Sequence, residues 1–442
     1  MSQQPAEHAP ESFFVAQLAE RAKQSSVAAP ATLASLVDNL SYLSGDELHL
    51  IKQAHAYATH AHDGQSRRTG HAYITHPTAV AHILSDMRMD PQTIMAALLH
   101  DVIEDSATNK QTLGEKFGES VAEIVDGVSK LSKIFSSRDE AQAENFQKMA
   151  LAMAKDIRVI LVKLADRVHN MRTIGVMSSA QRRRIAKETL DFYAPIANRL
   201  GIHTLKTELE DLGFKALYPL RADLIQQSVV AARGNRKELM EEIRDTITAA
   251  MNREGIAADV KAREKNSYSI YRKMKSKHKS FADIMDVFGF RIVVDQPDAC
   301  CRALGVVHNL YKPVTSRFKD YIAIPKINGY QSLHTSLFGM HGVPIEVQIR
   351  TKQMDAVADN GIAGHWLYKS DGDFDSNQQR ARQWTKDLLE LQKRAGDPLE
   401  FIESLKIDLF PGDVYVFTPR GNIMELPTGA SAVDFAYSVH TD

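Results

Sequence analysis

The amino-acid sequence predicts a multidomain protein of the α and α+β classes. Over residues 46–200, apolar residues recur with the 3.6-residue period of amphipathic helices and strand signals are few, so this part is expected to be all-α. From about residue 251, runs rich in β-branched residues alternate with helical segments, which predicts a mixed α+β domain. Beyond residue 404, short strand-like runs separated by Pro-Gly, Pro-Arg-Gly and Pro-Thr-Gly turns indicate the start of a small β-rich domain.

Length and composition restrict the possible functions. A chain of 442 residues exceeds the usual size of one hydrophobic core, so several domains are expected. Lys and Arg (54) nearly balance Asp and Glu (55), which argues against general nucleic-acid binding. The two cysteines, Cys300 and Cys301, are adjacent and offer no disulfide framework. No apolar run has the length of a membrane span, and the N-terminus lacks an export signal. A cytoplasmic enzyme without membrane contact is therefore predicted.

Six segments follow one another along the chain. They are an Ala/Ser/Gln/Pro-rich arm with one or two short helices (1–45), the helical domain (46–200), a helical connector (201–250), the α+β domain (251–375), a polar helical linker (376–403) and the β-rich start (404–442).

The helical domain contains a cluster of potential metal ligands in the run MAALLHDVIED. If this run is one continuous helix, His100 lies over Glu104 and Asp101 over Asp105, because residues four apart share a helix face. Four polar groups on an otherwise apolar helix are costly to bury unless a cation or hydrogen bonds compensate them. The pattern therefore predicts a metal-dependent hydrolytic site.

Further ligands must come from other helices. The run DRVHNM supplies Asp166, with His169 and Asn170 on neighbouring turns. In YATHAHDGQSRRTG three histidines, His55, His60 and His62, compete for the remaining position, and their spacing alone does not decide between them.

The α+β domain has basic and acidic groups suited to a nucleotide. The run AREKNSYSIYRKMKSKHKS is rich in Lys and Arg, and RFKDYIAIPKINGYQSLHT is a second basic run near Asp286. In PIEVQIR, Ile345, Val347 and Ile349 alternate with Glu346, Gln348 and Arg350, so one strand face is apolar and the other carries functional groups. Cations for phosphates and acids for Mg²⁺ predict a nucleotide-transfer site.

The motifs AHDGQSRR, YITHP, LLHDVIEDS, ENFQKM and VKLADRVHNMRT resemble the HD hydrolase domain of the long RelA/SpoT homologues. The resemblance implies a reaction that removes the 3′-pyrophosphate of (p)ppGpp, giving GDP or GTP and pyrophosphate. It implies these roles: His62, His100, Asp101 and Asp166 hold one Mn²⁺, Glu104 and Asp105 activate water, and Arg67 and Asn170 contact the nucleotide. Gln65, Tyr73, His76 and Pro77 also fit the family pattern, and Ala72 replaces a usual proline.

The α+β domain resembles the nucleotidyltransferase-like (p)ppGpp synthetase domain of the same family. The resemblance implies that ATP is bound by Arg263, Lys265, Ser269 and Lys273, and that Mg²⁺ is bound by Asp286 and Glu346. It also implies that Glu346 activates the 3′-hydroxyl of GDP or GTP and that Tyr330 stacks on guanine. The acceptor pocket would be completed by Lys326, Asn328 and His334. The motif at 317–320, RFKD, is similar to that of bifunctional or hydrolase-dominated members.

Departures from the family pattern concern the synthetase-like domain. Ala262 stands where the family usually has Gly, Asn266 where it usually has His, and residues 358–366 vary a supporting motif. Hydrolysis is therefore ranked first, with synthesis weak, lost or regulatory. The alternatives are a bifunctional enzyme, a guanine-nucleotide sensor without turnover and, from the helical domain alone, a generic HD phosphodiesterase.

The C-terminal segment is similar to the start of a TGS domain. Long members of the family continue beyond this point, so the chain is expected to be truncated within that domain. Acyl carrier protein or the ribosome are partners implied by the resemblance only.

Overall fold

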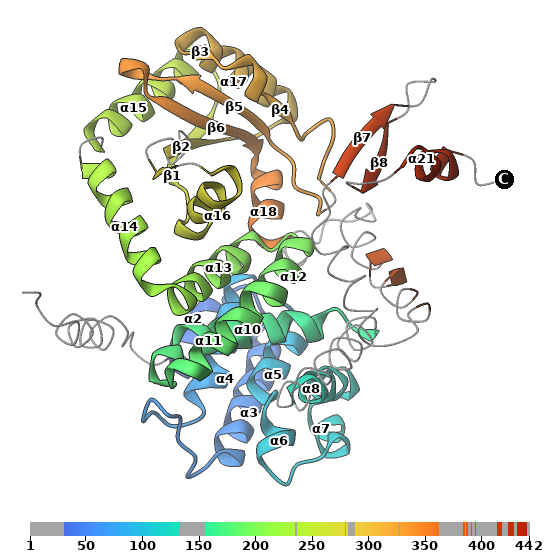
Figure 1. Cartoon of the computed structure of the whole chain (residues 1–442). Helices are drawn as coiled ribbons and strands as arrows, with labels where there is room; N and C mark the ends of the chain where they lie inside the picture. The colour runs from blue at the N-terminus through green and yellow to red at the C-terminus, as the bar shows by residue number, and fades with distance from the viewer. Residues whose placement is uncertain are drawn as a thin grey trace, which may run out of the picture. The chain divides into compact units, whose positions relative to one another are not determined.

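The computed structural model describes residues 31–132, 155–234, 237–278, 280–281, 288–326 and 328–361, and parts of 383–439. The chain divides into two compact units. The first contains the described residues from 31 to 129 and from 156 to 361, and the second contains 130–132, 155 and the described residues after 382. Figure 1 shows the elements, and each unit is described by itself.

The N-terminal part of the first unit is entirely helical, as the sequence predicts. Its helices are α2 (Leu33–Asn39), α3 (Gly45–Ala61), α4 (Thr75–Asp86), α5 (Pro91–Leu99), α6 (Val102–Asp105), α7 (Lys110–Phe117), α8 (Glu119–Ser132), which runs on into the second unit, α10 (Arg158–Arg172), α11 (Ser179–Glu188), α12 (Ala194–Arg199) and α13 (His203–Leu217), with a 3₁₀ turn at Ile174–Val176 and a π-helical turn, η2, at Thr189–Tyr193.

Local sequence signals account for the ends of these helices. Ser44 and Glu47 form a capping box at the start of α3. Asp90 caps α5, in which Pro91 occupies the first turn. Most of α10 is buried, including Lys163 and Arg167, so this central helix carries charged side chains into the interior, where they need partners.

The second part of the first unit is a mixed sheet with helices. The elements are α14 (Pro219–Gly234), α15 (Lys237–Arg253), β1 (Ala258–Glu264), α16 (Ser267–Lys277), β2 (Phe288–Val294), α17 (Pro297–Leu310), β3 (Lys312–Pro313), β4 (Lys319–Asp320), β5 (Leu333–Phe338), β6 (Pro344–Thr351) and α18 (Lys352–Asn360). The strand order is β1-β2-β6-β5-β3, with β4 beside β5. Only β2 and β6 are parallel.

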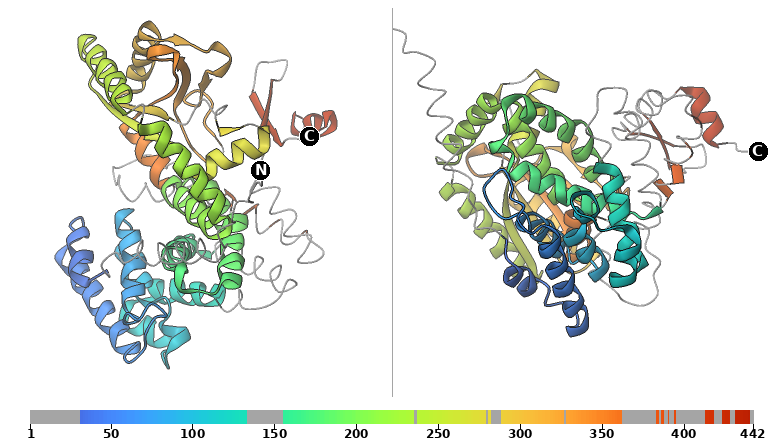
Figure 2. Two further views of the ribbon diagram at one scale, coloured as in Figure 1. Left: turned by 60° about the vertical axis from the view of Figure 1, so that its left-hand side comes forward. Right: turned by 90° about the horizontal axis from the view of Figure 1, so that it is seen from below.

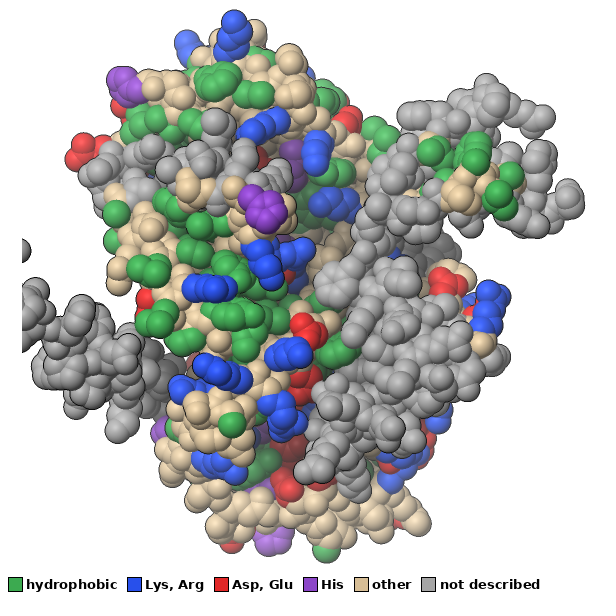
Figure 3. Space-filling model, viewed as in Figure 1, with side chains coloured by type: hydrophobic (Ala, Val, Ile, Leu, Met, Phe, Trp, Pro, Cys, Tyr) green, Lys and Arg blue, Asp and Glu red, His purple; other side chains and the backbone are tan. Residues whose placement is uncertain are grey.

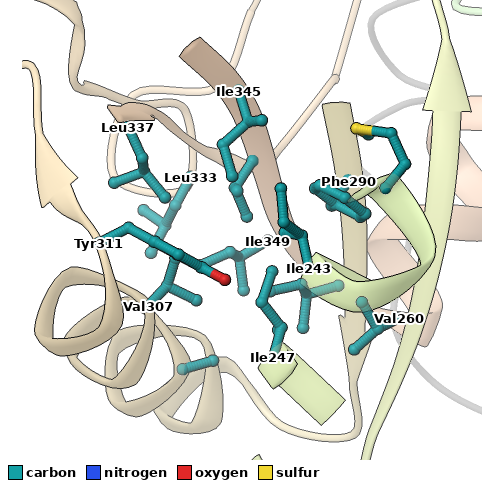
Figure 4. Packing of buried hydrophobic residues seen from close by; sticks show 14 of the residues in the cluster. Ile243, Ile247, Val260, Phe290, Val307, Tyr311, Leu333, Leu337, Ile345 and Ile349 are labelled. Atoms are coloured by element: carbon teal, nitrogen blue, oxygen red, sulfur yellow. The ribbon is translucent and has the colours of Figure 1, made fainter. Parts of the chain in front are cut away.

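The core of this part lies between the sheet and two of its helices. Figure 4 shows Ile243 and Ile247 of α15 and Val307 of α17 packed against strand residues that include Phe290 and Ile349. The apolar face predicted for PIEVQIR is confirmed, because Ile345, Val347 and Ile349 all belong to this core. Burial of such side chains contributes about 1.5–3 kcal/mol each.

The segment predicted as a connector, 201–250, divides between the two parts. Helix α13 packs on α10, α11 and α12, whereas α15 supplies core residues to the sheet. Helix α14 runs from one part to the other, as the views in Figures 1 and 2 show, and α13 also contacts α16 and α18. Helix α14 carries exposed apolar residues, Leu220, Leu224 and Val230.

The second unit contains an antiparallel pair, β7 (Asp413–Phe417) and β8 (Ile423–Pro427), followed by α21 (Ala432–Val439). The strands agree with the β-rich start predicted from the turn residues. The helix differs from that prediction. Most of the predicted linker 376–403 and residues 1–30 of the predicted arm lie outside the described residues.

Among the residues that the structure describes, no helix is long and apolar enough to cross a membrane.

Candidate metal centre and nucleotide pocket

The histidine-aspartate pair lies at a break between two helices, not within one. Helix α5 ends at Leu99 and α6 begins at Val102, so the continuous helix expected over MAALLHDVIED is wrong. Asp101 instead precedes α6, and its carbonyl oxygen accepts hydrogen bonds from the backbone N–H groups of Glu104 and Asp105 at 3.0 Å each. The break turns the pair inward while its polar groups are still held by local hydrogen bonds.

Four helices bring the potential ligands together. His62 ends α3, His76 lies in the first turn of α4, and Asp166 belongs to α10. His76 Nε2 lies 3.2 Å from Asp166 Oδ1 and 3.7 Å from Asp101 Oδ2. His100 Nε2 lies 3.2 Å from Asp101 Oδ1. Within the described part of the chain, the tightest group of potential ligands is His76, His100 and Asp101.

His76 is therefore part of the cluster, although the sequence analysis did not assign it as a metal ligand. The motif YITHP contained the signal, but the spacing of that histidine from His100 gave no indication of contact. His62, which the resemblance selected, is buried but lies outside the tightest group. Its ring stacks on Tyr73 with 4.5 Å between centroids, and the Tyr73 hydroxyl donates to Asp101 Oδ2 at 2.8 Å.

The histidine tautomers fit a cation. Nδ1 of His100 lies 2.8 Å from the carbonyl oxygen of Ala97, and Nδ1 of His62 lies 2.9 Å from Gln65 Oε1. Since both oxygens can only accept, each Nδ1 carries a proton, and Nε2 is the nitrogen of each ring that can lose its proton to bind a cation. Both Nε2 atoms are buried without a hydrogen-bond partner among the described residues. This is the arrangement in which histidine binds metals while its other nitrogen fixes the ring.

Two neighbouring buried carboxylates need positive charge. Lys163 Nζ supplies part of it to Asp166 Oδ2 at 2.8 Å. Burial opposes ionisation of Asp166, but the charge of Lys163 and the imidazole of His76 hold the pKa of its carboxyl well below the usual range. Burial likewise lowers the pKa of His100, but Asp101 and Asp166 outweigh it and raise that pKa to about 9. The residues present thus fit a divalent cation.

The other predicted groups surround this cluster. Glu104 is half-buried and Asp105 exposed. Asn170 donates to Asp166 Oδ1, and Arg67 Nη2 donates to Asn170 Oδ1 at 2.9 Å. The residues expected to contact the nucleotide therefore meet at the edge of the metal cluster. His55 and His60 do not belong to the tightest group.

The second pocket lies on one face of the mixed sheet and has a volume of about 260 Å³. It contains seven of the residues predicted for the nucleotide: Arg263, Lys265, Lys326, Asn328, Tyr330, His334 and Glu346. Ser269 and Lys273 lie on α16 and do not line it, and Asp286 lies outside the described residues. In the view of Figure 3, Lys and Arg side chains are spread over the face shown, among acidic and apolar side chains.

Strand register places the acid and the aromatic group of this pocket together. Glu346 of β6 lies opposite Ser336 of β5, and its Oε1 is 3.4 Å from His334 Nδ1. The Tyr330 hydroxyl is 2.8 Å from His334 Nε2. Lys265 Nζ lies 3.9 Å from Glu346 Oε2, and Lys326 Nζ lies 5.3 Å from the centre of the Tyr330 ring. A half-buried acid, cations and an aromatic ring are the groups that nucleotide binding requires.

The pocket also contains residues to which no role was assigned from the sequence. They are Asn198, His203, Lys206, Gly289, Phe290, Arg291, Gln348 and Arg350. For Gln348 and Arg350 the alternation in PIEVQIR was the signal, since it put both on the polar face with Glu346. Asn198, His203 and Lys206 come from the helical part, and no sequence signal indicated that these distant segments meet.

Three regions of the chain match known families. Residues 54–203 match the HD domain, residues 262–373 match the region found in RelA / SpoT proteins, and residues 414–442 match the TGS domain. The chain thus combines a helical HD domain, which contains a His/Asp cluster, with a RelA / SpoT region, which contains a pocket on a mixed sheet. It is thus a homologue of the RelA/SpoT proteins.

Similar proteins are known from several bacteria. The chain is 58% identical over 404 residues to a guanosine-3′,5′-bis(diphosphate) 3′-pyrophosphohydrolase of Vibrio cholerae, covering 91% of this chain and 57% of that protein. It is 57% identical over 404 residues to the bifunctional (p)ppGpp synthase/hydrolase SpoT of Escherichia coli, covering 91% and 58%. Over 405 residues it is 47% identical to a GTP pyrophosphokinase of Myxococcus xanthus, covering 91% and 54%.

The chain therefore spans somewhat more than half the length of these relatives. A solved structure of a metazoan ortholog of SpoT that hydrolyses ppGpp is 27% identical and covers 40% of this chain and 97% of its own, with a TM-score of 0.31.

Proposed function

We propose that this protein hydrolyses the 3′-pyrophosphate of (p)ppGpp at a centre where His62, His100, Asp101 and Asp166 bind Mn²⁺, with His76, 3.2 Å from Asp166, beside these ligands. The observation that carries the proposal is the pair of buried histidine Nε2 atoms without partners, oriented by Ala97 and Gln65 beside two ionised carboxylates. The names of the similar proteins support (p)ppGpp as the substrate.

The reaction transfers a pyrophosphoryl group from the 3′-oxygen to water. The oxygen of water forms a bond to the phosphorus attached to the 3′-oxygen, that P–O bond breaks, and the 3′-oxygen takes up a proton. A bound divalent cation would acidify water and polarise the phosphoryl oxygen. Glu104 and Asp105, one turn after Asp101, accept the proton of water in this proposal. Arg67, 2.9 Å from Asn170, binds phosphate or the nucleotide.

Removal of the cation tests this function directly. We expect purified protein with Mn²⁺ to convert labelled ppGpp into GDP and pyrophosphate, and a chelator to abolish this conversion. Readdition of Mn²⁺ should restore it, and parallel additions of Mg²⁺ and Zn²⁺ establish which ion the site prefers, because nitrogen ligands disfavour Mg²⁺. Intact ppGpp after incubation with each of these ions would contradict the proposal.

We further propose that the second pocket binds a guanine nucleotide and that its transfer of pyrophosphate from ATP is weak, lost or regulatory. In this proposal Tyr330 stacks on guanine and Glu346 activates the 3′-hydroxyl, with Mg²⁺ as the cation if transfer occurs. The specific observation in favour is that His334, 3.4 Å from Glu346, links that acid to the Tyr330 hydroxyl. Acyl carrier protein and the ribosome as partners stay predictions.

Formation of AMP separates binding from transfer. With labelled ATP, GDP and Mg²⁺, we expect little or no AMP from the wild-type chain but measurable binding of GDP. Any AMP formed should disappear in Glu346→Gln, which keeps the shape of the side chain but removes the base, and should persist in Asp101→Asn. Rapid AMP formation that Glu346→Gln eliminates would instead establish a bifunctional enzyme.

A further inference from the structure

The second pocket is not built by the α+β part alone. The corner between α12 and α13, residues 198–206, comes from the helical part and contributes Asn198, His203 and Lys206 to the pocket lining. This corner is joined to the rim of the pocket by two side chain to backbone hydrogen bonds. Asn328 Nδ2 donates to the carbonyl oxygen of Asn198 at 2.9 Å, and Thr204 Oγ1 donates to that of Asp359 at 2.9 Å.

Two glycines allow the corner to approach this closely. Gly201 has a φ of +75°, and a Cβ there would lie 2.9 Å from the carbonyl oxygen of Asn328. Gly361 has a φ of +55°, and a Cβ there would lie 2.2 Å from the carbonyl oxygen of Leu200. Any side chain at either position would combine backbone strain with a clash against the opposite backbone. The contact between corner and rim is thus one of direct backbone packing.

His203 is the corner residue that contacts a predicted nucleotide ligand. Its Nε2 lies 3.2 Å from Nη2 of Arg263, whose Nη1 donates to Gln348 Oε1 at 2.7 Å. The guanidinium is therefore held from two sides, by the helical part and by strand β6. An Arg has only donors, so His203 Nε2 must accept and the imidazole is neutral. Burial, followed by the charges of Lys206 and Arg263, lowers the pKa of His203 to about 3, consistent with a neutral ring.

The other arginines of the pocket have acidic partners, which makes Arg263 distinctive. Arg291 Nη1 lies 3.2 Å from Asp355 Oδ1, and Arg350 Nη2 pairs with the same carboxylate. The two side chains that are hydrogen-bonded to Arg263, His203 and Gln348, are neutral, so they orient the guanidinium without adding negative charge to the pocket. Neutral hydrogen-bond partners fix the orientation of the guanidinium and reduce the positive potential at the pocket only slightly.

We propose that the α12–α13 corner is an integral wall of the nucleotide pocket, and that His203 is a positioning residue which orients Arg263 toward a nucleotide phosphate. This inference rests on the proposed nucleotide binding at the second pocket. An α+β domain without the corner would hold Arg263 from one side only, and would bind the same nucleotide more weakly.

The test uses calorimetry to measure the binding of Mg²⁺-GDP and of a non-hydrolysable ATP analogue to the full chain. The binding that Tyr330→Ala removes is assigned to the second pocket. We expect His203→Ala to weaken this binding about tenfold, as loss of a hydrogen bond to a charged group does. His203→Gln should recover most of the affinity, because its amide oxygen can accept from Arg263. Glu208→Gln, on the same helix but paired with Arg172, should bind as the wild type does.

A second pair of variants tests the corner without changing a pocket side chain. Gly201→Ala should weaken nucleotide binding, because the added methyl group forces the corner away from Asn328. Gly305→Ala is the matched control, since a Cβ there meets nothing within 4 Å in α17, and it should leave binding unchanged.

Wild-type affinity in both His203→Ala and Gly201→Ala would overturn the inference, as would equal losses in His203→Ala and His203→Gln. If the wild-type chain binds neither nucleotide, the inference is also wrong. Hydrolysis of ppGpp at the metal cluster is measured in a separate assay and does not depend on this result.

Discussion

Replacement of Asp101 by Asn is expected to reduce ppGpp hydrolysis on the order of 10³-fold, the largest effect on activity of any single change considered. Asp101 Oδ1 lies 3.2 Å from His100 Nε2, and its Oδ2 accepts a hydrogen bond from Tyr73. The amide keeps the shape and the hydrogen bond but removes the negative charge that a divalent cation requires. Loss of one preorganised charge in a buried site costs about 3–4 kcal/mol of transition-state stabilisation, which corresponds to this factor.

Two measurements distinguish loss of the cation from loss of the fold. Mn²⁺ affinity, measured by equilibrium dialysis, should fall together with hydrolysis. The circular dichroism spectrum in the presence of chelator should keep the wild-type helix content, because the amide has the shape of the carboxylate and can still accept the hydrogen bond from Tyr73. Asp86→Asn changes an exposed carboxylate on α4 and should leave both hydrolysis and metal affinity intact. If Asp101→Asn retained a tenth of the wild-type hydrolysis, the assigned metal centre would be wrong.

The cluster illustrates what the sequence could and could not predict about the site. Residue types predicted His100, Asp101 and Asp166, and the resemblance selected His62; the structure brings His100 and Asp101 together with His76. The helical period of the apolar residues led to a wrong prediction at MAALLHDVIED, where one continuous helix was expected. The helix breaks there although His100 and Asp101 both have dihedral angles in the helical region, and an apolar period does not reveal a break of this kind. His76 was missed as a member because its contact with Asp166 depends on how α4 packs on α10.

The second pocket likewise contains features that the sequence predicts and contacts that it does not. Alternation in PIEVQIR is a local property, so the core face and the polar face of β6 could both be predicted from the sequence. The approach of His203 to Arg263 spans 60 residues and depends on the docking of a helix corner against a sheet. No local pattern encodes such a contact. The sequence contains Gly201 and Gly361, whose positive φ angles the contact requires, but a glycine alone does not indicate which segment packs against it.

Loss of Glu188 is expected to have the largest effect on stability, about 3–5 kcal/mol. Arg167 directly follows Asp166 on α10 and is buried, with Nη2 2.9 Å from Glu188 Oε1 and the guanidinium 4.1 Å from the centre of the Tyr193 ring. Burial disfavours its charge, but Tyr193 and Glu188 more than offset this and raise the pKa of Arg167 further above its usual value. Glu188→Ala leaves that charge buried without its carboxylate.

A second ion pair on the same helix provides the matched control. Arg172 Nε and Nη2 donate to the two carboxylate oxygens of Glu208 at 2.6 and 2.9 Å, so this pair has more hydrogen bonds than Arg167 with Glu188. Its side chains are 45% and 33% exposed, against 10% and 8% for the buried pair. Solvent screens the exposed pair, and Glu208→Ala should therefore cost no more than about 1 kcal/mol. Urea unfolding followed by circular dichroism compares the two variants. If Glu208→Ala were the more destabilising change, the number of hydrogen bonds and not burial would determine the stability of α10, and the explanation given for its buried charges would fail.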